Sequence, residues 1–133
     1  KSTLIKEDEI PSLIDELPIL MVAAGLARGK TVIKGVQELK VKETDRIKSM
    51  VFNLTKLHAN IRVKTLKKSV MIEIRGVSSF KRARLRSFSD HRTAMSMVVA
   101  ALATAQGAFL DDISCVRKSF PQFLSSLNHL LGK

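Results

Sequence analysis

The sequence predicts an α+β fold in which units of helices and short strands recur along the chain. Helical apolar spacing alternates with short β-branched runs, and the order of elements in residues 20–46 returns in residues 98–121. Units that cannot bury their helices alone must share a core, so we expect helices packed with small mixed sheets. The repeat aligns small residues in three pairs: Gly29 with Gly107, Ala23 with Ala101, and Ala27 with Ala105.

A helix and a short strand are expected near the start of the chain. Residues 11–29 favour a helical region, because Pro18 is tolerated in a first turn and Gly29 can end a helix. Residues 31–33 are β-branched and predict a strand. The spacing i, i+3, i+4, i+7 assigns the apolar helical face to Leu20, Ala23, Ala24 and Ala27.

A second helix is expected from Thr44, which can cap it, to about His58. A hairpin should follow, with strands at residues 61–63 and 70–74 and a turn at residues 67–69. The helical spacing directs five side chains to the core: Ile47, Met50, Val51, Leu54 and Leu57.

The second half of the chain repeats this alternation. Residues 83–85 predict a strand, and Asp90 opens a helix that continues through Gln106 and stops at Gly107. Residues 108–110 predict another short strand. A last helix is expected to start at Phe120 or Pro121 and to reach Leu131.

The chain is basic, with 23 Lys+Arg against 12 Asp+Glu among 133 residues and a formal charge of +11. The excess is local, since 17 basic and 5 acidic residues lie between Lys30 and Arg92. Such a surplus indicates an anionic partner, which can be nucleic acid, acidic lipid or a phosphorylated small molecule. Many of these cations can equally be solvated surface charges, and the absence of Tyr and Trp weakens single-strand nucleic-acid binding.

Composition excludes several classes of protein. A content of 45% hydrophobic residues excludes a disordered basic tail. The single cysteine, Cys115, excludes a disulfide framework and indicates a reducing, cytoplasmic location. The three histidines have no ligand spacing, so we expect no metal. The apolar stretch from Leu17 to Ala27 is too short to span a membrane and is not a signal peptide.

Four short segments at element boundaries carry the candidate site, because side chains from distant segments converge at such places. Their acids can be helix caps or general bases, and their cations can be surface charges or ligands of an anion. Arg92 can offer a planar fork to a carboxylate or a phosphate. The segments are Ile14–Pro18, Val41–Arg46, Ser89–Arg92 and Cys115–Pro121.

These segments resemble the C-terminal part of the EPSP synthase (3-phosphoshikimate 1-carboxyvinyltransferase) family. The resemblance implies repeated βαβαββ units in two domains that close over the substrates. Residues 1–133 would be the C-terminal portion, about two units of one domain, without the N-terminal remainder. Ser89 departs from the Gly or Asn that many members have before Asp-His-Arg. The motifs are Val41-Lys42-Glu43-Thr44-Asp45-Arg46, Asp90-His91-Arg92-x-Ala94-Met95, Ile14-Asp15-Glu16-x-Pro18 and Lys118-Ser119-Phe120-Pro121.

The resemblance also implies a reaction. The family transfers the enolpyruvyl group of phosphoenolpyruvate to the 5-hydroxyl of shikimate 3-phosphate, a step of aromatic amino acid biosynthesis, with no metal or organic cofactor. Asp15 matches the general base and a shikimate 3-phosphate ligand, and Glu43 matches a glutamate proposed in proton transfer. The remaining matches are Lys42 with shikimate 3-phosphate, Arg46 and Arg92 with the phosphoenolpyruvate carboxylate, and Lys118 with its phosphate.

The expected partners are therefore the two small substrates and the N-terminal part of the same enzyme, with no nucleic acid or membrane. We expect the whole enzyme to be a monomer. Two alternatives stay open on the sequence. One is a basic module that binds nucleic acid or acidic surfaces through Lys64 to Arg86. The other is the related UDP-N-acetylglucosamine enolpyruvyl transferase, which shares the architecture.

Overall fold

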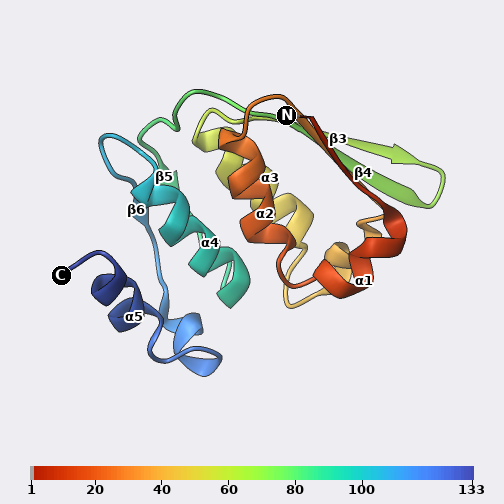
Figure 1. Ribbon diagram of the computed structural model, residues 1–133. Helices are drawn as coiled ribbons and strands as arrows, with labels where there is room; N and C mark the ends of the chain where they lie inside the picture. The colour runs from red at the N-terminus through yellow and green to blue at the C-terminus, as the bar shows by residue number, and fades with distance from the viewer. Residues whose placement is uncertain (1) are drawn as a thin grey trace.

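A four-stranded sheet covered by helices on one face forms the first part of the molecule (Figure 1). The structure is a computed structural model and describes residues 2–133. The strands lie in the order β1-β2-β4-β3, with β1 parallel to β2 and with β4 antiparallel to both neighbours. The strands are β1 (Thr3–Ile5), β2 (Lys30–Lys34), β3 (Asn60–Leu66) and β4 (Ser69–Arg75). The helices are η1 (Glu7–Glu9), α1 (Ile10–Leu13), α2 (Leu17–Leu26), η2 (Gln37–Val41) and α3 (Arg46–Lys56).

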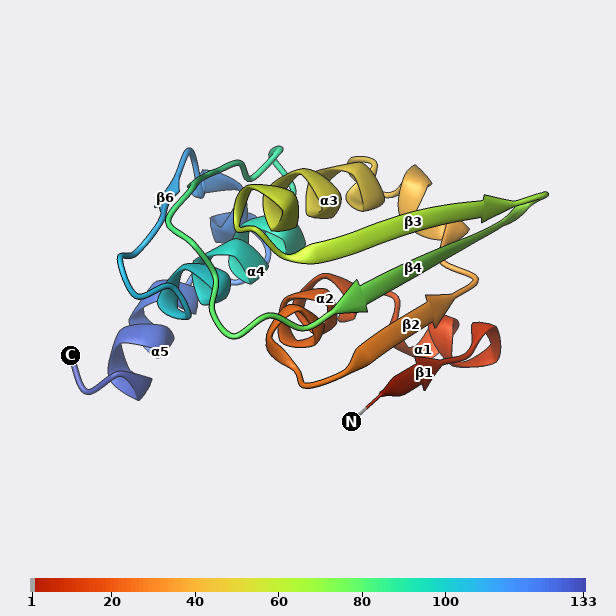
Figure 2. The same ribbon diagram turned by 90° about the horizontal axis from the view of Figure 1, so that it is seen from above.

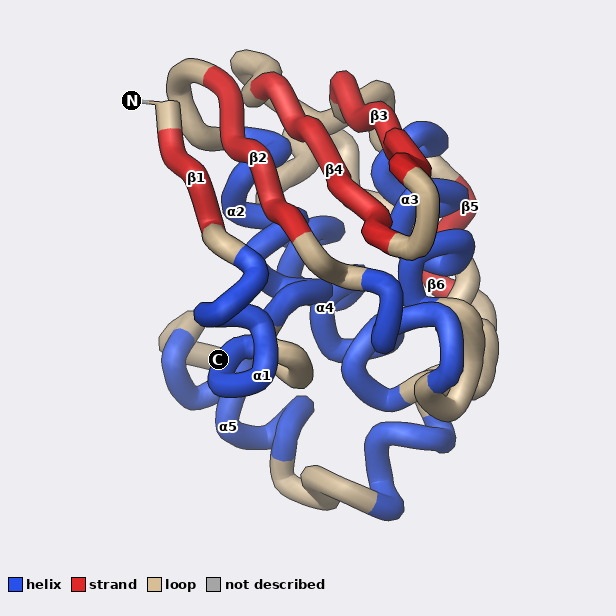
Figure 3. The backbone as a smooth tube through the Cα atoms, turned by 90° about the vertical axis from the view of Figure 1, so that its right-hand side faces the viewer, coloured by secondary structure: helices blue, strands red, loops and turns tan. Residues whose placement is uncertain are grey.

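The two faces of this sheet have opposite character. Helix α2 packs against β4 and α3 packs against β3, so the helices cover one face only (Figure 3). The inward positions Ile33, Ile72 and Ile74 are fully buried, while the alternate positions Lys30 and Lys34 are exposed. The two-residue period of a strand produces this division. The predicted hairpin is confirmed, and β1 is an element that the sequence reading missed.

A second unit follows with the same order of elements as far as its second strand, 3-10 helix and following helix, and no hairpin comes after them within residues 2–133. It contains β5 (Arg84–Leu85), α4 (His91–Leu102), β6 (Phe109–Leu110), η3 (Ser114–Lys118) and α5 (Phe123–Leu130). Strands β5 and β6 are parallel, as β1 and β2 are. Helix α4 packs beside α2, which joins the two units (Figure 2). The α+β fold and the repeat are therefore confirmed, and the order β1-α2-β2-α3-β3-β4 is the βαβαββ unit.

The predicted first helix is wrong in its limits and in part of its buried face. A turn at residues 14–16 separates α1 from α2, and α2 ends at Leu26 rather than beside Gly29. The backbone N–H of Val77, which follows β4, donates to the carbonyl of Gly25 at 2.8 Å, while Ala27 is extended. The end of α2 is therefore set by a hydrogen bond from outside the helix rather than by Gly29. Ala23 and Ala27 are exposed, and the α2 core positions are Leu17, Pro18, Met21, Val22, Ala24 and Gly25.

Three other helix ends differ from the prediction. Asp45, not Thr44, caps α3, since its carboxylate accepts from the N–H of Lys48 at 3.1 Å. Helix α4 ends at Leu102 rather than Gln106. The N–H groups of Ala103 and Thr104 donate to carbonyls only three residues back, and the Thr104 hydroxyl also donates to the carbonyl of Ala101 at 2.8 Å. Helix α5 starts at Phe123, later than expected. The predicted apolar face of α3 is confirmed at four buried positions and one half-buried position, Val51.

Candidate functional site

The predicted site residues meet where two helices begin. Arg46 is the first residue of α3, and Asp90 is the N-cap of α4, which carries Arg92 in its first turn. Asp15 lies in the turn before α2, and Glu43 lies between η2 and α3. Both helix starts carry partial positive charge, which adds to that of the two guanidinium groups. The structure thus brings together four predicted residues: Asp15, Glu43, Arg46 and Arg92.

Arg46 is the centre of this cluster, with only 1% of its side chain exposed. Its Nε donates to Asp90 at 2.7 Å, one terminal nitrogen donates to Asp15 at 3.1 Å, and the other donates to Glu43 at 2.5 Å. Burial lowers the pKa of Arg46, but the hydrogen bond and charge of Asp90 and the charge of Glu43 outweigh this effect and raise the pKa. The guanidinium is therefore a permanently charged group with every nitrogen facing a carboxylate.

Arg92 joins the cluster from the neighbouring helix. One of its terminal nitrogens lies 3.5 Å from Asp15, and the other lies 3.9 Å from Glu16. Asp15 thus contacts both arginines, one through each carboxylate oxygen. The side chains of Arg92 and Asp15 are partly exposed, so this edge of the cluster is open to solvent. The alternative in which an acid of this segment caps α2 with its side chain is wrong, since Glu16 takes the N-cap position without a side-chain hydrogen bond.

Asp90 is a site residue that the sequence reading assigned only to a cap. Its fully buried carboxylate accepts from the N–H groups of Arg92 and Thr93 at 2.8 and 3.3 Å, which confirms the cap. Its second oxygen accepts from Arg46 Nε and, at 3.4 Å, from the hydroxyl of Thr44. One carboxylate therefore fixes the starts of α3 and α4 relative to each other. Asp90 was visible in the sequence as an acid close to Arg92, but its buried partner, Arg46, lies 44 positions away in the chain.

The two lysines of the prediction lie further out. Lys118 is exposed at the end of η3 and lines a hollow of about 350 Å³ together with Glu43, Ser89, His91 and Cys115. Lys42 is half-buried beside Glu43 in the chain, and within residues 2–133 it forms no recorded side-chain bond to the cluster. The structure therefore brings Lys118 to the edge of the site and leaves Lys42 outside the ion-pair network.

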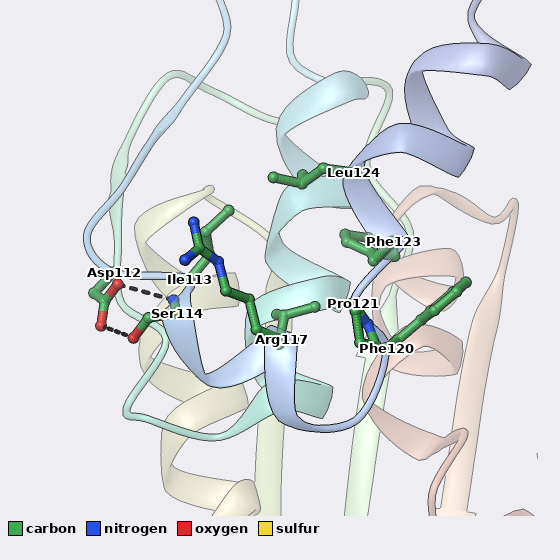
Figure 4. Close-up of a pocket in the computed structure, with 9 residues that line it drawn as sticks. Asp112, Ile113, Ser114, Arg117, Phe120, Pro121, Phe123 and Leu124 are labelled. Atoms are coloured by element: carbon green, nitrogen blue, oxygen red, sulfur yellow. Dashed lines mark hydrogen bonds between the residues drawn. The ribbon is translucent and has the colours of Figure 1, made fainter.

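Two other hollows can be compared with the cluster, and only the first includes its residues. One, of about 190 Å³, is formed by Asp15, Arg92, Met95 and Phe123 with neighbouring residues. The other, of about 350 Å³, lies between η3 and α5 and contains no predicted site residue; its lining includes Asp112, Arg117, Phe120 and Leu124 (Figure 4). Asp112 there accepts from the N–H and hydroxyl of Ser114, which lowers its pKa.

The described residues offer little to a metal ion or a cysteine nucleophile. Residues 2–133 contain no group of three His, Cys, Asp or Glu side chains placed to hold a metal. Burial and the charge of Asp112 raise the pKa of the Cys115 thiol, which disfavours the reactive thiolate. In the same part of the chain no helix is long and apolar enough to cross a bilayer.

A strained turn leads into the cluster. Phe88 and Ser89 have φ angles of 53° and 57°, in the left-handed region that favours glycine and asparagine. This explains why Gly or Asn suits the position before Asp-His-Arg.

We expect Ser89→Gly to raise the free energy of unfolding by about 1 kcal/mol, because glycine removes the Cβ conflict. Urea unfolding checks this, with Ser89→Ala as the control that keeps Cβ. An equal gain from alanine would contradict the backbone explanation.

Comparison with known proteins agrees with the predicted family. The model of the EPSP synthase (3-phosphoshikimate 1-carboxyvinyltransferase) family matches residues 1–127. A 3-phosphoshikimate 1-carboxyvinyltransferase of Oceanobacillus iheyensis is 44% identical over 127 residues, which are 96% of this chain and 29% of that protein. One of Citrifermentans bemidjiense is 44% identical over 129 residues, 97% of this chain and 29% of that protein.

A solved structure shows the same likeness. EPSP synthase from Acinetobacter baumannii superposes with a TM-score of 0.84 at 35% identity, covering 97% of this chain and 30% of that one. The repeated units have the enolpyruvyl transferase fold, as the superposition on EPSP synthase shows. Within that class, the chain belongs to the EPSP synthase family. It spans about 29% of the length of the curated relatives that it matches.

Proposed function

We propose that the protein containing this chain transfers the enolpyruvyl group of phosphoenolpyruvate to the 5-hydroxyl of shikimate 3-phosphate. The observation that carries the proposal is the sharing of Asp15 by Arg46 and Arg92 at the starts of two helices. Two guanidinium groups beside one carboxylate form a site into which a second carboxylate fits. The names of the relatives support this reaction.

In this proposal the phosphoenolpyruvate carboxylate takes the place of protein carboxylates on Arg46. Asp15 and Glu43 are half exposed and can move into solvent, whereas Asp90 is buried and keeps hold of Nε. The guanidinium then keeps its orientation while its two terminal nitrogens change partners. Asp15 and Glu43 are released from the guanidinium when the substrate arrives. Asp15 then acts as a free carboxylate that can accept a proton, whereas Glu43 takes up a proton from solvent and can donate it.

Each released carboxylate has a defined task. Asp15 accepts the proton of the 5-hydroxyl as the hydroxyl oxygen bonds to the phosphate-bearing carbon of phosphoenolpyruvate. Protonated Glu43 gives its proton to the methylene carbon and becomes a carboxylate. In the second step the former methylene carbon, now a methyl group, loses a proton to the Glu43 carboxylate as the bond between the adjacent carbon and the phosphate oxygen breaks. Phosphate leaves with the proton that Asp15 took from the 5-hydroxyl. Lys118 stabilises the charge of the departing phosphate, and Lys42 binds shikimate 3-phosphate.

The charge of the cluster indicates that other parts of the protein are required. Four carboxylates and two guanidinium groups carry a formal charge of −2, which Lys42 and Lys118 only neutralise. Two polyanionic substrates need further cations. We propose that this chain is the C-terminal portion of one domain in a two-domain, monomeric enzyme, which its span of about 29% of the relatives supports in part. The free thiol of Cys115 supports a cytoplasmic location.

Phosphate release by the full-length protein tests the function. Phosphoenolpyruvate with shikimate 3-phosphate should release phosphate, whereas UDP-N-acetylglucosamine as acceptor should release none. The isolated 133 residues should release none with either acceptor, because the site lacks the other half of its cations.

Release with only the UDP-sugar would assign the related transferase. Turnover by the isolated chain would contradict the shared site. A full-length protein that is inactive with both but binds random DNA would favour the basic module.

A further inference from the structure

The outer face of the four-stranded sheet carries a second cluster of cations, remote from the helix starts. Lys30 of β2 pairs in register with Arg75 of β4, which pairs with Asn60 of β3. Arg62 lies two positions further along β3, opposite Glu73. Residues paired across strands, or two apart along one strand, share a face, so all five side chains point away from the helices. They line a hollow of about 190 Å³.

This hollow holds more positive charge than its own carboxylate can balance. Glu73 pairs with Lys64 at 3.1 Å, and this hydrogen bond, together with the charges of Lys30 and Arg62, lowers the Glu73 pKa despite partial burial. Within residues 2–133 the structure records no ion pair for Lys30, Arg62 or Arg75. Lys30, Arg62 and Arg75 therefore share the hollow with one carboxylate, Glu73, which already forms an ion pair with Lys64.

We propose that this hollow binds a polyvalent phosphate, meaning a pyrophosphate-like group that is free or part of a larger metabolite. Two guanidinium forks can each hold a phosphoryl group through paired N–H donors, and Lys30 and the Asn60 amide add further donors. The face has no aromatic residue on which a nucleic-acid base could stack, which favours a small anion over a single strand.

The spacing of the strands suits an anion with two charged ends. Lys30 and Arg75 lie on adjacent strands about 5 Å apart, and Arg62 lies diagonal to Arg75 at about 7–8 Å. A single carboxylate can occupy one guanidinium, whereas two linked phosphoryl groups reach both. This site is separate from the cluster at Arg46 and needs none of its residues.

Calorimetric titration of the full-length protein with pyrophosphate tests the proposal. In the double variant Arg62→Gln/Arg75→Gln we expect Kd at this site to rise about tenfold or more, because two charge-assisted contacts are lost. Lys67→Gln/Lys68→Gln removes the same charge from the nearby hairpin turn and should change Kd by less than about threefold. In Arg92→Gln, which alters the candidate active site, pyrophosphate should still bind the sheet.

Each other result overturns the proposal. Equal weakening in both double variants would mean diffuse attraction to a basic surface. Loss of all pyrophosphate binding in Arg92→Gln would mean that the only site is the one between the helices. No binding by the parent protein would exclude the ligand class, and binding of poly-glutamate but not pyrophosphate would assign an acidic protein partner. Circular dichroism confirms that each variant is folded before titration.

Discussion

Asp90→Ala is expected to lower the free energy of unfolding by about 3–5 kcal/mol, the cost typical of leaving a buried ion pair without one partner. Asp90 is fully buried and holds Arg46 Nε at 2.7 Å while it caps α4. Its removal leaves the guanidinium with only the two half-exposed carboxylates of Asp15 and Glu43. Urea unfolding of the full-length protein, followed by circular dichroism, measures the loss.

Asp45→Ala provides the matched control for Asp90→Ala. Asp45 also caps a helix, but its partners are Lys48 and solvent, so we expect a loss of about 1 kcal/mol. The difference between the two variants isolates the contribution of the buried pair from that of the cap. If both variants lose the same free energy, Arg46 finds adequate compensation elsewhere and Asp90 is only a cap.

Asp15→Ala is expected to reduce kcat by about 10²–10⁴-fold, the loss that its proposed role as general base implies, with little increase in the KM for phosphoenolpyruvate. The structure adds a reason for the KM to remain low or even fall. Asp15 occupies Arg46 and Arg92 before substrate arrives, so its removal leaves both guanidinium groups available. Steady-state kinetics of the full-length enzyme measures both constants.

Arg92→Ala should give the opposite pattern, with a KM for phosphoenolpyruvate raised about tenfold or more and a smaller loss of kcat. Glu16→Gln serves as the control, since Glu16 is exposed and lies 3.9 Å from Arg92, and it should change either constant by less than about fivefold. If Asp15→Ala mainly raises KM and Arg92→Ala mainly lowers kcat, the roles of base and ligand have been exchanged.

The sequence predicted those features that depend on local periodicity. The apolar face of α3 and the alternation in β4 are correct, because burial repeats every 3.6 or 2 residues along the chain. The ends of α2 and α4 were predicted too late. They are set by Val77 and Thr104, whose bonds to the helix carbonyls cannot be read from helical spacing.

The site was predicted in part, and only the resemblance allowed roles to be assigned. Local sequence could show acids and cations near helix starts, and the structure brings Asp15, Glu43, Arg46 and Arg92 into one network. The local sequence could not show that Asp90 binds Arg46 as well as the start of α4, because a helix cap already accounted for its carboxylate. The roles of these residues in proton transfer and substrate binding remain predictions.

The outer strands of the four-stranded sheet also bear on solubility. Unpaired backbone groups at a sheet edge can pair with another molecule, which leads to aggregation. At one edge β1 has only three residues, and at the other β3 carries Arg62 and Lys64 with exposed side chains. A short strand offers few bonds to an incoming chain, and charged side chains repel an identical edge. The cations of β3 therefore also protect the sheet from edge-to-edge association.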